Sequence, residues 1–372
     1  MSALPPLSFF HLLRRLFLVL FVFFAFSDAG TIEKPLGCFS SMLTAGAVQN
    51  PNLHGALVRC TWAQLEPQPG VFDFSSIEKQ LRLLPPNKKW SLAVYAGWTS
   101  IATEPHSDLP QKFSQAISSR RPQHPHSPPW LSSDKGVSTF TILFRGQAAE
   151  MPRYWDPLVQ EHLKRLMTAL AQQYNQDERL QLVYVPQMTS NGIEGHFNGV
   201  PHETLLAAAD LGPDEQEDFE HLWTKASLTA IRSTAEAFNT KAIAFEVHEL
   251  LGSVSIPQTI MTQILNDPHL KHQVGIGMWW ISGKTNYQSE LLELIQKFPG
   301  DIYGQVIGRS TQPQRFPNGD YAAVFEQAQA LGLRYIEAWN YEFEHHSHDD
   351  LLAAFNLYCE TEFTDPNTAP TP

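Results

Sequence analysis

Residues 57–74 read Leu57-Val58-Arg59-Cys60-Thr61-Trp62-Ala63-Gln64-Leu65-Glu66-Pro67-Gln68-Pro69-Gly70-Val71-Phe72-Asp73-Phe74. An apolar run that ends near Trp62 has the composition of a buried β-strand. Two prolines and a glycine then favour a turn, and Asp73 can cap a helix that begins near Ser75. The stretch therefore predicts one strand-turn-helix unit.

The same unit recurs along the chain. The runs expected to form strands are Gly55–Trp62, Trp90–Trp98, Ser138–Phe144, Leu180–Met188, Ala242–His248, Val274–Ile281, Ile302–Ile307 and Leu333–Trp339. Most are continuously apolar, which is typical of parallel strands covered on both faces. The clearest helical segments between them are Asp156–Tyr174, Asp214–Phe238, Ser289–Phe298 and Asp320–Leu331.

Strands that alternate with helices predict an α/β protein, and eight such units predict a closed (β/α)8 TIM barrel. A doubly wound open sheet is the alternative, but no GxGxxG motif follows the first expected strand. We expect the barrel to span residues 30–363, with an insertion near 105–133 that is rich in Pro, His and Ser and a disordered tail over 364–372.

The composition of the chain excludes some classes of protein function. The chain has 372 residues, 43% of them hydrophobic, and a formal net charge of −12. Its charged fraction of 17% is below the roughly 25% of ordinary soluble domains, which argues against a disordered acidic chain. The longest basic runs are pairs, so we expect no nucleic-acid partner.

Residues 1–29 have the pattern of a secretory signal. Basic Arg14-Arg15 precedes the apolar run Leu16–Phe26, and Ser27-Asp28-Ala29 supplies small residues at a cleavage site. A helix of eleven residues is about 16 Å long, too short for a hydrocarbon core of about 30 Å. We therefore expect a secreted or periplasmic protein with no membrane attachment after cleavage. An uncleaved membrane anchor is the alternative.

The three cysteines are too few for a disulfide scaffold. Cys60 lies within an expected strand and is interpreted as a core residue. Cys38 and Cys359 lie near the two ends of the expected fold, and a bridge between them is one possibility.

Tryptophans gather where the expected strands end. A (β/α)8 barrel forms its active site at the C-terminal ends of its strands. A Trp face there can stack on the C–H face of a sugar ring. Core packing is the alternative for each residue alone, whereas the set favours a carbohydrate cleft made by Trp62, Trp98, Trp279, Trp280 and Trp339.

The first unit resembles the first repeat of clan A glycoside hydrolases, particularly the family 42 β-galactosidase type. The residues that carry the resemblance are Arg59, Trp62 and the run Leu65-Glu66-Pro67 that leads to Gly70 and Phe72-Asp73-Phe74. It implies a barrel glycosidase that needs no cofactor. Arg59 is a charge inside an apolar strand and needs an anionic partner, which could be an active-site carboxylate or a salt bridge elsewhere.

The resemblance also implies a catalytic carboxylate after the fourth strand. Clan A enzymes carry an Asn-Glu pair there as general acid/base, and Glu194 is the corresponding candidate. Asn191 is separated from Glu194 by two residues instead of adjoining it. Clan A places the second carboxylate at the end of the seventh strand, but residues 303–310 contain no acid.

Glu337 and Glu246 are the two substitutes for this second carboxylate. Each lies in an apolar strand, where a carboxylate must be paired, hydrogen-bonded or protonated. The two-residue period places Glu337 on the face of Trp339 and Glu246 on the face of His248. Structural pairing with Arg59 or Arg334 is the alternative for both.

Other chemistries find less support. Residues 342–350 concentrate His, Glu and Asp, but no spacing matches a zinc or calcium loop, so we expect no metal site. The sequence also lacks the GxSxG turn that a Ser-His-Asp hydrolase of the α/β-hydrolase type would need.

The sequence thus predicts a secreted glycoside hydrolase that cleaves a neutral oligo- or polysaccharide with two carboxylates. Glu194 is the expected general acid/base, and Glu337 or Glu246 the second carboxylate. The alternative is a non-catalytic carbohydrate-binding or surface protein on a degenerate glycosidase barrel. The oligomeric state is not predicted. Besides the five tryptophans, the residues expected to hold carboxylates and sugar hydroxyls are Arg59, Gln187, Asn191 and Asn340.

Overall fold

The computed structural model describes residues 32–102, 124–197 and 199–364. Apart from Ile32, these residues belong to one compact unit, Glu33–Pro372. The expected signal segment, the tail beyond residue 364 and most of the insertion near 105–133 lie outside the described residues.

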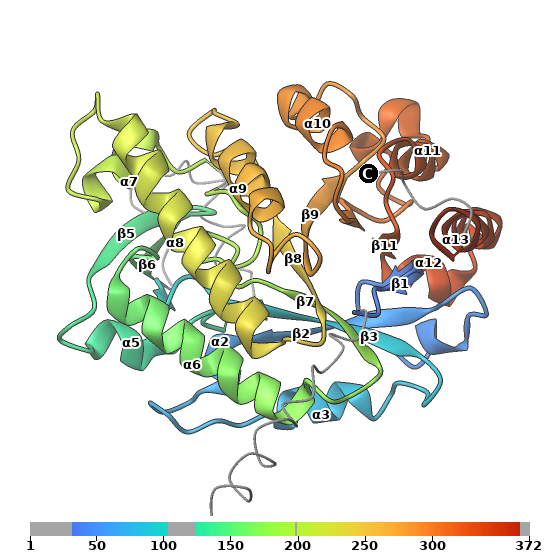
Figure 1. The fold of residues 1–372 in the computed structure, drawn as a ribbon, viewed down its shortest axis with the longest axis horizontal. Coiled ribbons are helices and arrows are strands. Elements are labelled where there is room, and N and C mark those ends of the chain that lie inside the picture. Colours follow the sequence, from blue (N-terminus) through green and yellow to red (C-terminus); the bar gives the residue numbers. More distant parts are fainter. Residues whose placement is uncertain (1–31, 103–123, 198, 365–372) are drawn as a thin grey trace, which may run out of the picture. The chain divides into compact units, whose positions relative to one another are not determined.

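Eight parallel strands close into a barrel (Figure 1), as the sequence predicts. Around the barrel their order is β1-β11-β10-β9-β8-β7-β3-β2, so the first strand pairs with the last. These strands are β1 (Gly37–Ser40), β2 (Gly55–Thr61), β3 (Lys89–Tyr95), β7 (Leu180–Tyr184), β8 (Ala242–Glu246), β9 (Val274–Ile281), β10 (Ile302–Val306) and β11 (Tyr335–Ala338).

One barrel strand was not predicted and one predicted strand lies outside the barrel, and the two errors compensate. The first barrel strand is the short β1, which was not predicted, so Gly55–Trp62 supplies the second strand and Trp90–Trp98 the third. The expected third strand, Ser138–Phe144, is β5 (Thr139–Phe144) of a separate antiparallel sheet with β4 (Ser100–Ile101) and β6 (Gln147–Pro152). Leu180–Met188 is still the fourth barrel strand, and the expected positions of strands four to eight hold.

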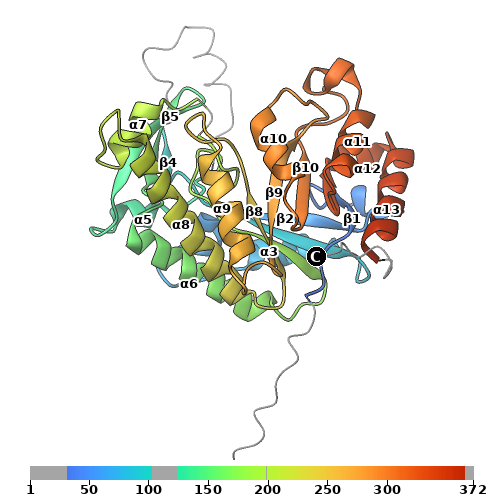
Figure 2. The same ribbon diagram turned by 45° about the horizontal axis from the view of Figure 1, so that its top comes forward.

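Helices surround the barrel (Figures 1 and 2), and all four expected ones are present within a few residues of their expected bounds. The longer helices are α6 (Pro157–Tyr174), α8 (Gln216–Ala237), α9 (Ser255–Asn266), α10 (Ser289–Gln296), α11 (Ala322–Ala330) and α13 (Asp349–Thr364). The shorter ones are α2 (Trp62–Leu65), α3 (Ser75–Leu81), α5 (Pro129–Ser133), α7 (His202–Ala208) and α12 (Asn340–His345), and the 3-10 turns are η1 (Ala47–Gln49), η2 (Pro313–Arg315) and η3 (Pro317–Gly319). Among the described residues, no helix has the length and apolar character needed to span a membrane.

Local chemistry explains where helix α6 begins. Asp156 precedes it in an extended conformation, and its side chain accepts a hydrogen bond from the Leu158 amide at 2.9 Å. Pro157 occupies the first helical position, where a missing N–H costs nothing. One apolar stripe of α6, which includes Leu163, Leu166 and Leu170, is buried.

Aromatic side chains fill the barrel interior. Tyr335 lies 4.5 Å from Phe39 and 6.0 Å from Tyr303 between ring centroids, and all three rings are fully buried. Glu337 follows Tyr335 by two residues on β11, so it points to the same interior. In the register of the sheet, Glu337 is paired with Phe39 on β1 and Gln305 on β10. An ionisable group therefore belongs to the packed centre of the barrel.

The three cysteines are free thiols. Cys60 is a core residue, as expected. Cys38 and Cys359 are both buried, but each has a backbone carbonyl as its hydrogen-bond partner: Leu352 at 3.5 Å and Arg334 at 3.3 Å. The possible Cys38–Cys359 bridge is therefore not formed.

Replacing Trp223 should strongly destabilise the barrel. Trp223 is 1% exposed on α8, and its ring lies 5.0 Å from Tyr154 and 5.4 Å from Phe197. Trp223→Ala leaves a large cavity, and we expect it to lower the free energy of unfolding by about 3–5 kcal/mol. Denaturant unfolding measures this change. Leu357→Ala, at a position that is 64% exposed, is the control and should change stability by less than about 0.5 kcal/mol.

Candidate active site

Three neighbouring strands supply the candidate site. Strands β7, β8 and β9 are adjacent in the barrel, so the segments that follow them lie side by side. The loop after β7 carries Glu194 and His196, the end of β8 carries Glu246 and His248, and β9 carries Trp279. This edge is where a (β/α)8 barrel forms its active site.

The loop after β7 is shaped by its own hydrogen bonds. The side-chain Oδ1 of Asn191 accepts from the Glu194 backbone amide at 3.2 Å, and the Thr189 hydroxyl donates to the Glu194 backbone carbonyl at 2.6 Å. Gly192 has a φ of +88°, and a Cβ there would lie 3.0 Å from the Ala96 carbonyl oxygen. Asn191 therefore orients the backbone that presents Glu194, although it is not adjacent to it.

Glu246 is a fully buried carboxylate that ties the three strand ends together. It accepts hydrogen bonds from the backbone amides of Gly195, at 2.6 Å, and Trp279, at 3.1 Å. His248 Nδ1 lies 3.0 Å from its Oε2 atom. Burial and the nearby Glu194 charge raise the pKa of Glu246 well above its usual range, although the amide donors counteract the rise.

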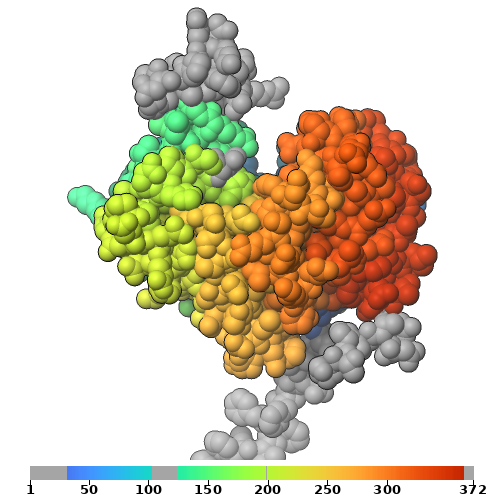
Figure 3. All heavy atoms as spheres, turned by 90° about the horizontal axis from the view of Figure 1, so that it is seen from above, coloured from blue at the N-terminus to red at the C-terminus, as the bar shows by residue number. Residues whose placement is uncertain are grey.

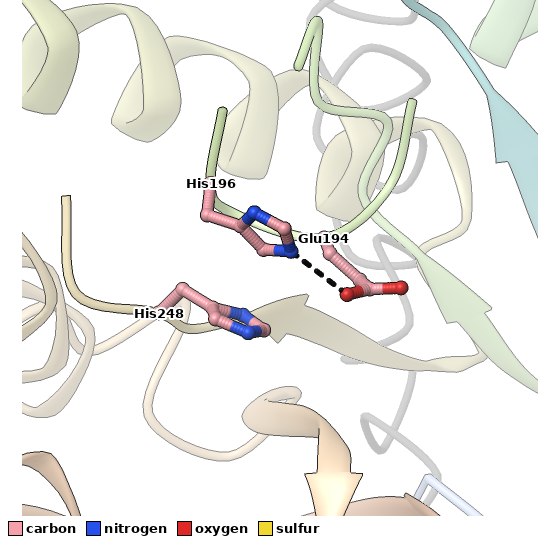
Figure 4. A group of neighbouring side chains, drawn as sticks. All are labelled: Glu194, His196 and His248. Carbon is pink, nitrogen blue, oxygen red and sulfur yellow. Dashed lines mark hydrogen bonds and ion pairs between the residues drawn. The ribbon is translucent and has the colours of Figure 1, made fainter. Parts of the chain in front are cut away.

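Glu194 is partly exposed and forms a compact cluster with His196 and His248. Its carboxylate Oε2 lies 3.0 Å from His196 Nε2, and one ligand atom from each of the three residues lies within 4.8 Å of the others. Figure 4 shows the three side chains turned toward one another. The side chains of Glu194 and His196 are 27% and 19% exposed.

The three groups of this cluster differ in their protonation. Burial raises the pKa of Glu194, but the hydrogen bonds with His196 and Asn191 and the neighbouring imidazoles together lower it by more, so it lies below its usual range. Burial lowers the pKa of His196, but the hydrogen bond and charge of Glu194, together with the charge of Glu246, raise it by more. Burial and the neighbouring His196 lower the pKa of His248 to about 3, so that its ring is neutral at pH 7.

Glu337 lies in the barrel interior and has no exposed surface. The Tyr184 hydroxyl donates to its Oε1 atom at 3.0 Å, the Tyr335 hydroxyl donates to the same atom, and the Gln305 amide donates to Oε2. Burial raises the pKa of Glu337, although these donors and the Arg59 charge counteract it. Glu337 lies on the eighth barrel strand, and Gln305 is its neutral neighbour on the seventh.

Arg59 reaches toward the barrel interior from β2. Its guanidinium lies 5.6 Å from the centroid of the Trp279 ring, a cation–π contact. Its Nε and Nη2 atoms are buried and have no hydrogen-bond partner among the described residues. The Arg59 charge lowers the pKa of Glu337, as expected if Arg59 has an active-site carboxylate as its partner. The two side chains form no direct salt bridge in the described structure.

The five candidate tryptophans are not equally available for stacking. Trp62, Trp98 and Trp280 belong to the hydrophobic core, where their rings contact those of Trp130, His126 and His248 respectively. Trp62 Nε1 also donates to Glu66 at 2.8 Å, and Glu66 accepts from the Gly70 amide, so this pair stabilises the turn after β2. Trp279 is 4% exposed, whereas Trp339 is partly exposed beneath the Arg309 guanidinium.

The two candidate amides have different surroundings. Gln187 is fully buried and donates to the carbonyl oxygens of Glu246, at 2.8 Å, and Ile193, at 3.2 Å. Gln187 therefore fixes the backbone of Glu246 and of the loop after β7, and it does not face a substrate. Asn340 is partly exposed and donates to Glu344 at 3.1 Å, while its carbonyl oxygen has no partner among the described residues.

A pocket of about 290 Å³ opens beside the cluster. Figure 3 shows the surface hollowed between the lime part of the chain, which includes α7, and the orange part, which includes α10. Residues that line the pocket include His196, His202, His248, Leu250 and Tyr287. The two histidines of the cluster are thus reached from a hollow on the surface.

The three carboxylates could be predicted from the sequence, whereas the pairing of the two histidines was not predicted. The available signal was a repeated Glu-x-His pattern, Glu194-Gly195-His196 and Glu246-Val247-His248, at the ends of two successive barrel strands. Because parallel strands end at the same edge, the repeat indicates that the two histidines meet.

Comparisons with known proteins bear on the fold. No protein-family model matches the sequence, and no curated protein matches it. Among solved structures, the catalytic domain of a β-amylase from Paenibacillus polymyxa aligns over 87% of this chain and 98% of its own, with a TM-score of 0.59 and 8% identity.

Two further structures align less closely. Endo-glycoceramidase II from a Rhodococcus species covers 84% of this chain and 74% of its own, with a TM-score of 0.46 and 12% identity. An exo-β-1,4-mannosidase from Opitutaceae bacterium strain TAV5 covers 92% and 63%, with a TM-score of 0.45 and 13% identity. All three neighbours are glycoside hydrolases, and none is named a β-galactosidase. The β-amylase likeness supports the (β/α)8 barrel fold, and the family 42 resemblance of the first repeat stays a prediction.

Acid should destabilise the protein partly through His126, whose ring lies 4.4 Å from that of Trp98. Burial and the Arg145 charge lower the pKa of His126 from 6.5 to about 4. Between these values the unfolded chain binds the proton and the folded chain does not, so stability falls as the pH drops from 6.5 toward 4. The expected loss is ~1.4 kcal/mol for each pH unit in this window.

Denaturant unfolding at several pH values checks this prediction. The variant His126→Gln removes the titrating ring, and its stability should depend less steeply on pH than that of the wild type over the same window. Parallel pH dependences for the two proteins would contradict the assignment.

Proposed function

We propose that this protein is a glycoside hydrolase that cleaves a neutral oligo- or polysaccharide, with Glu194 as its general acid/base. The observation that carries the proposal is the position of Glu194. It follows the fourth strand of a glycosidase-like barrel, and of the three candidate carboxylates it alone has exposed surface. The neutral substrate is favoured by the acidic surplus of the chain, because a net charge of −12 disfavours polyanions.

His196 extends this role. Its Nε2 lies 3.0 Å from Glu194, and the carboxylate raises the pKa of the ring. A protonated imidazole at this distance can return a proton to Glu194 after each transfer to a leaving group. The pair would therefore reload the general acid between turnovers.

A two-carboxylate mechanism also needs a second carboxyl group at a defined distance from Glu194. Glycosidases hold their two carboxyl groups about 5–5.5 Å apart for retention and about 6.5–9.5 Å for inversion. Glu246 contacts the segment that carries Glu194, because the backbone amide of Gly195, the next residue, donates to its carboxylate. Both Glu246 and Glu337 are covered, so the proposal requires a substrate to displace part of the surrounding loops before either group acts directly.

A second candidate function follows from the same burial. Glu246 and Glu337 have 0% exposure and are fully hydrogen-bonded, as expected of groups that hold a shape. On this basis the barrel would bind carbohydrate without cleaving it. Partly exposed Trp339 would then supply a stacking face for a sugar ring.

We also infer that the protein acts outside the cytoplasm. The support is the pattern of residues 1–29, a basic pair, a short apolar run and small residues before a cleavage site. Mass spectrometry of the protein from its own host would find an N-terminus near Gly30 if the segment is removed.

The variant Glu194→Gln separates the two candidate functions. Glutamine keeps the size and hydrogen-bond capacity of the side chain but cannot exchange a proton. We expect a loss of at least about 100-fold in kcat on any glycan that the wild type cleaves, with binding retained. Reducing-sugar release from a panel of neutral glycans measures turnover, and calorimetry measures binding.

Glu203→Gln is the matched control, because Glu203 is an exposed acid on the nearby α7 and should leave kcat unchanged. Full turnover by Glu194→Gln would remove Glu194 from the mechanism. Glycan binding without turnover by the wild type would favour the binding protein.

The pH dependence of turnover gives an independent check. Because the pKa of Glu194 is below its usual range, the proton donor is present in quantity only in acid. We expect kcat to rise as the pH falls below 6 and to decline toward neutrality, down to the pH at which the protein unfolds. Initial rates at constant ionic strength measure the profile, and a maximum above pH 7 would contradict the assigned role.

A further inference from the structure

Two Glu-x-His segments from successive strand ends bring two imidazoles and one carboxylate to a single point. Glu194 and His196 come from the loop after β7, and His248 follows β8. Their ligand atoms lie within 4.8 Å of one another, and the ring centroids of the two histidines are 4.4 Å apart (Figure 4). A tetrahedral zinc ion with bonds of about 2.1 Å separates its ligand atoms by about 3.4 Å, so small side-chain rotations would complete the geometry.

The second carboxylate of these segments, Glu246, is not part of the cluster but orients it by contacting His248. Its oxygens lie 2.9 and 3.0 Å from His248 Nδ1, which leaves His248 Nε2 for an ion. A ligating histidine almost always has a carboxylate, carbonyl or water on its other nitrogen, because this bond fixes the ring and its tautomer. The Glu246–His248 pair has that arrangement.

Backbone hydrogen bonds fix Glu246 in turn. The amides of Gly195 and Trp279 donate to its two oxygens, and these residues belong to the segments on either side of β8. Gln187 holds the Glu246 carbonyl at 2.8 Å. The support for His248 is therefore built into three strands and does not depend on a flexible side chain.

The cluster is also accessible. His196 and His248 line the pocket of about 290 Å³ between α7 and the α10 side, and Glu194 is 27% exposed. An ion can enter from this pocket, and three protein ligands leave a coordination position open for water or a sugar hydroxyl.

We propose that Glu194, His196 and His248 bind a divalent transition-metal ion of the zinc type, with Glu246 as the positioning residue of His248. Two imidazoles with one carboxylate match the preferences of zinc and its neighbours and are too rich in nitrogen for calcium or magnesium. The site goes beyond the proposed glycosidase and does not depend on it. A bound ion would occupy the carboxylate that otherwise exchanges protons, so the metal-bound and metal-free proteins should differ in any turnover.

Zinc binding by the full chain tests the proposal directly. The protein is stripped with a chelator, dialysed and titrated with ZnCl2 by calorimetry, and CoCl2 serves as a spectroscopic probe. We expect one ion per chain with micromolar or tighter affinity, and a visible cobalt spectrum typical of four-coordination. Neither readout requires a sugar substrate, so failure of the glycosidase proposal leaves this test intact.

Single variants locate the ion. His196→Ala and His248→Ala should each weaken zinc binding by more than the roughly 10–100-fold expected when an outer partner is lost. The matched control is His202→Ala, which lines the same pocket outside the cluster and should bind as the wild type does. Circular dichroism verifies folding, and if the buried His248 variant does not fold, His196→Ala at the more exposed position decides the question.

Glu246→Gln tests the positioning role. Glutamine still reaches His248 Nδ1 but supplies a neutral acceptor, and we expect zinc affinity to fall about 10–100-fold with one ion still bound. Millimolar or absent zinc binding by the wild type would overturn the proposal. So would tight binding that persists in both histidine variants but disappears in His346→Ala, which would place the ion in the His-rich segment after β11.

Discussion

The candidate site depends on the burial of one carboxylate, Glu246. A carboxylate without exposed surface is costly unless donors surround it, and this one has two backbone amides and a histidine. The amides belong to the loop after β7 and to β9, on either side of its own strand. Glu246 therefore holds three strand ends in register by hydrogen bonds, and the placement of Glu194 and His196 follows from that arrangement.

Exposure divides the carboxylates of the barrel into two kinds. Glu246 and Glu337 are enclosed, and burial raises the pKa of each. Glu194 remains partly exposed beside His196, and its pKa is lowered. Opposite shifts in neighbouring acids are a recurrent feature of sites that transfer protons. Here the exposed Glu194 can contact a ligand, whereas the enclosed Glu246 and Glu337 hold neighbouring segments in place.

Much of the fold could be predicted from the sequence, because parallel strands are continuously apolar and the helices carry clear apolar stripes. The failures have local causes. Gly37–Ser40 has too few residues to show a pattern, and Thr139–Phe144 is apolar enough to resemble a barrel strand although two of its side chains are exposed. Glu194 could be found from its place after the fourth strand, whereas the burial of Trp62 and Trp98 depends on loops whose paths the sequence does not specify. To predict that His196 and His248 lie together, one must know that β7 and β8 are neighbours in the barrel, and the sequence does not give this order directly.

The pairing of β1 with β11 has a consequence for biosynthesis. A ribosome releases β1 long before Tyr335–Ala338 exists, so until then one edge of β1 lacks its parallel partner. The amide of Cys38 likewise waits for Asn356, whose side chain accepts from it at 2.8 Å. Unpaired strand edges recruit other chains, and contacts between distant residues form slowly. The barrel therefore closes only after Tyr335–Ala338 has been made, and until then this edge of β1 is open to pairing with other chains.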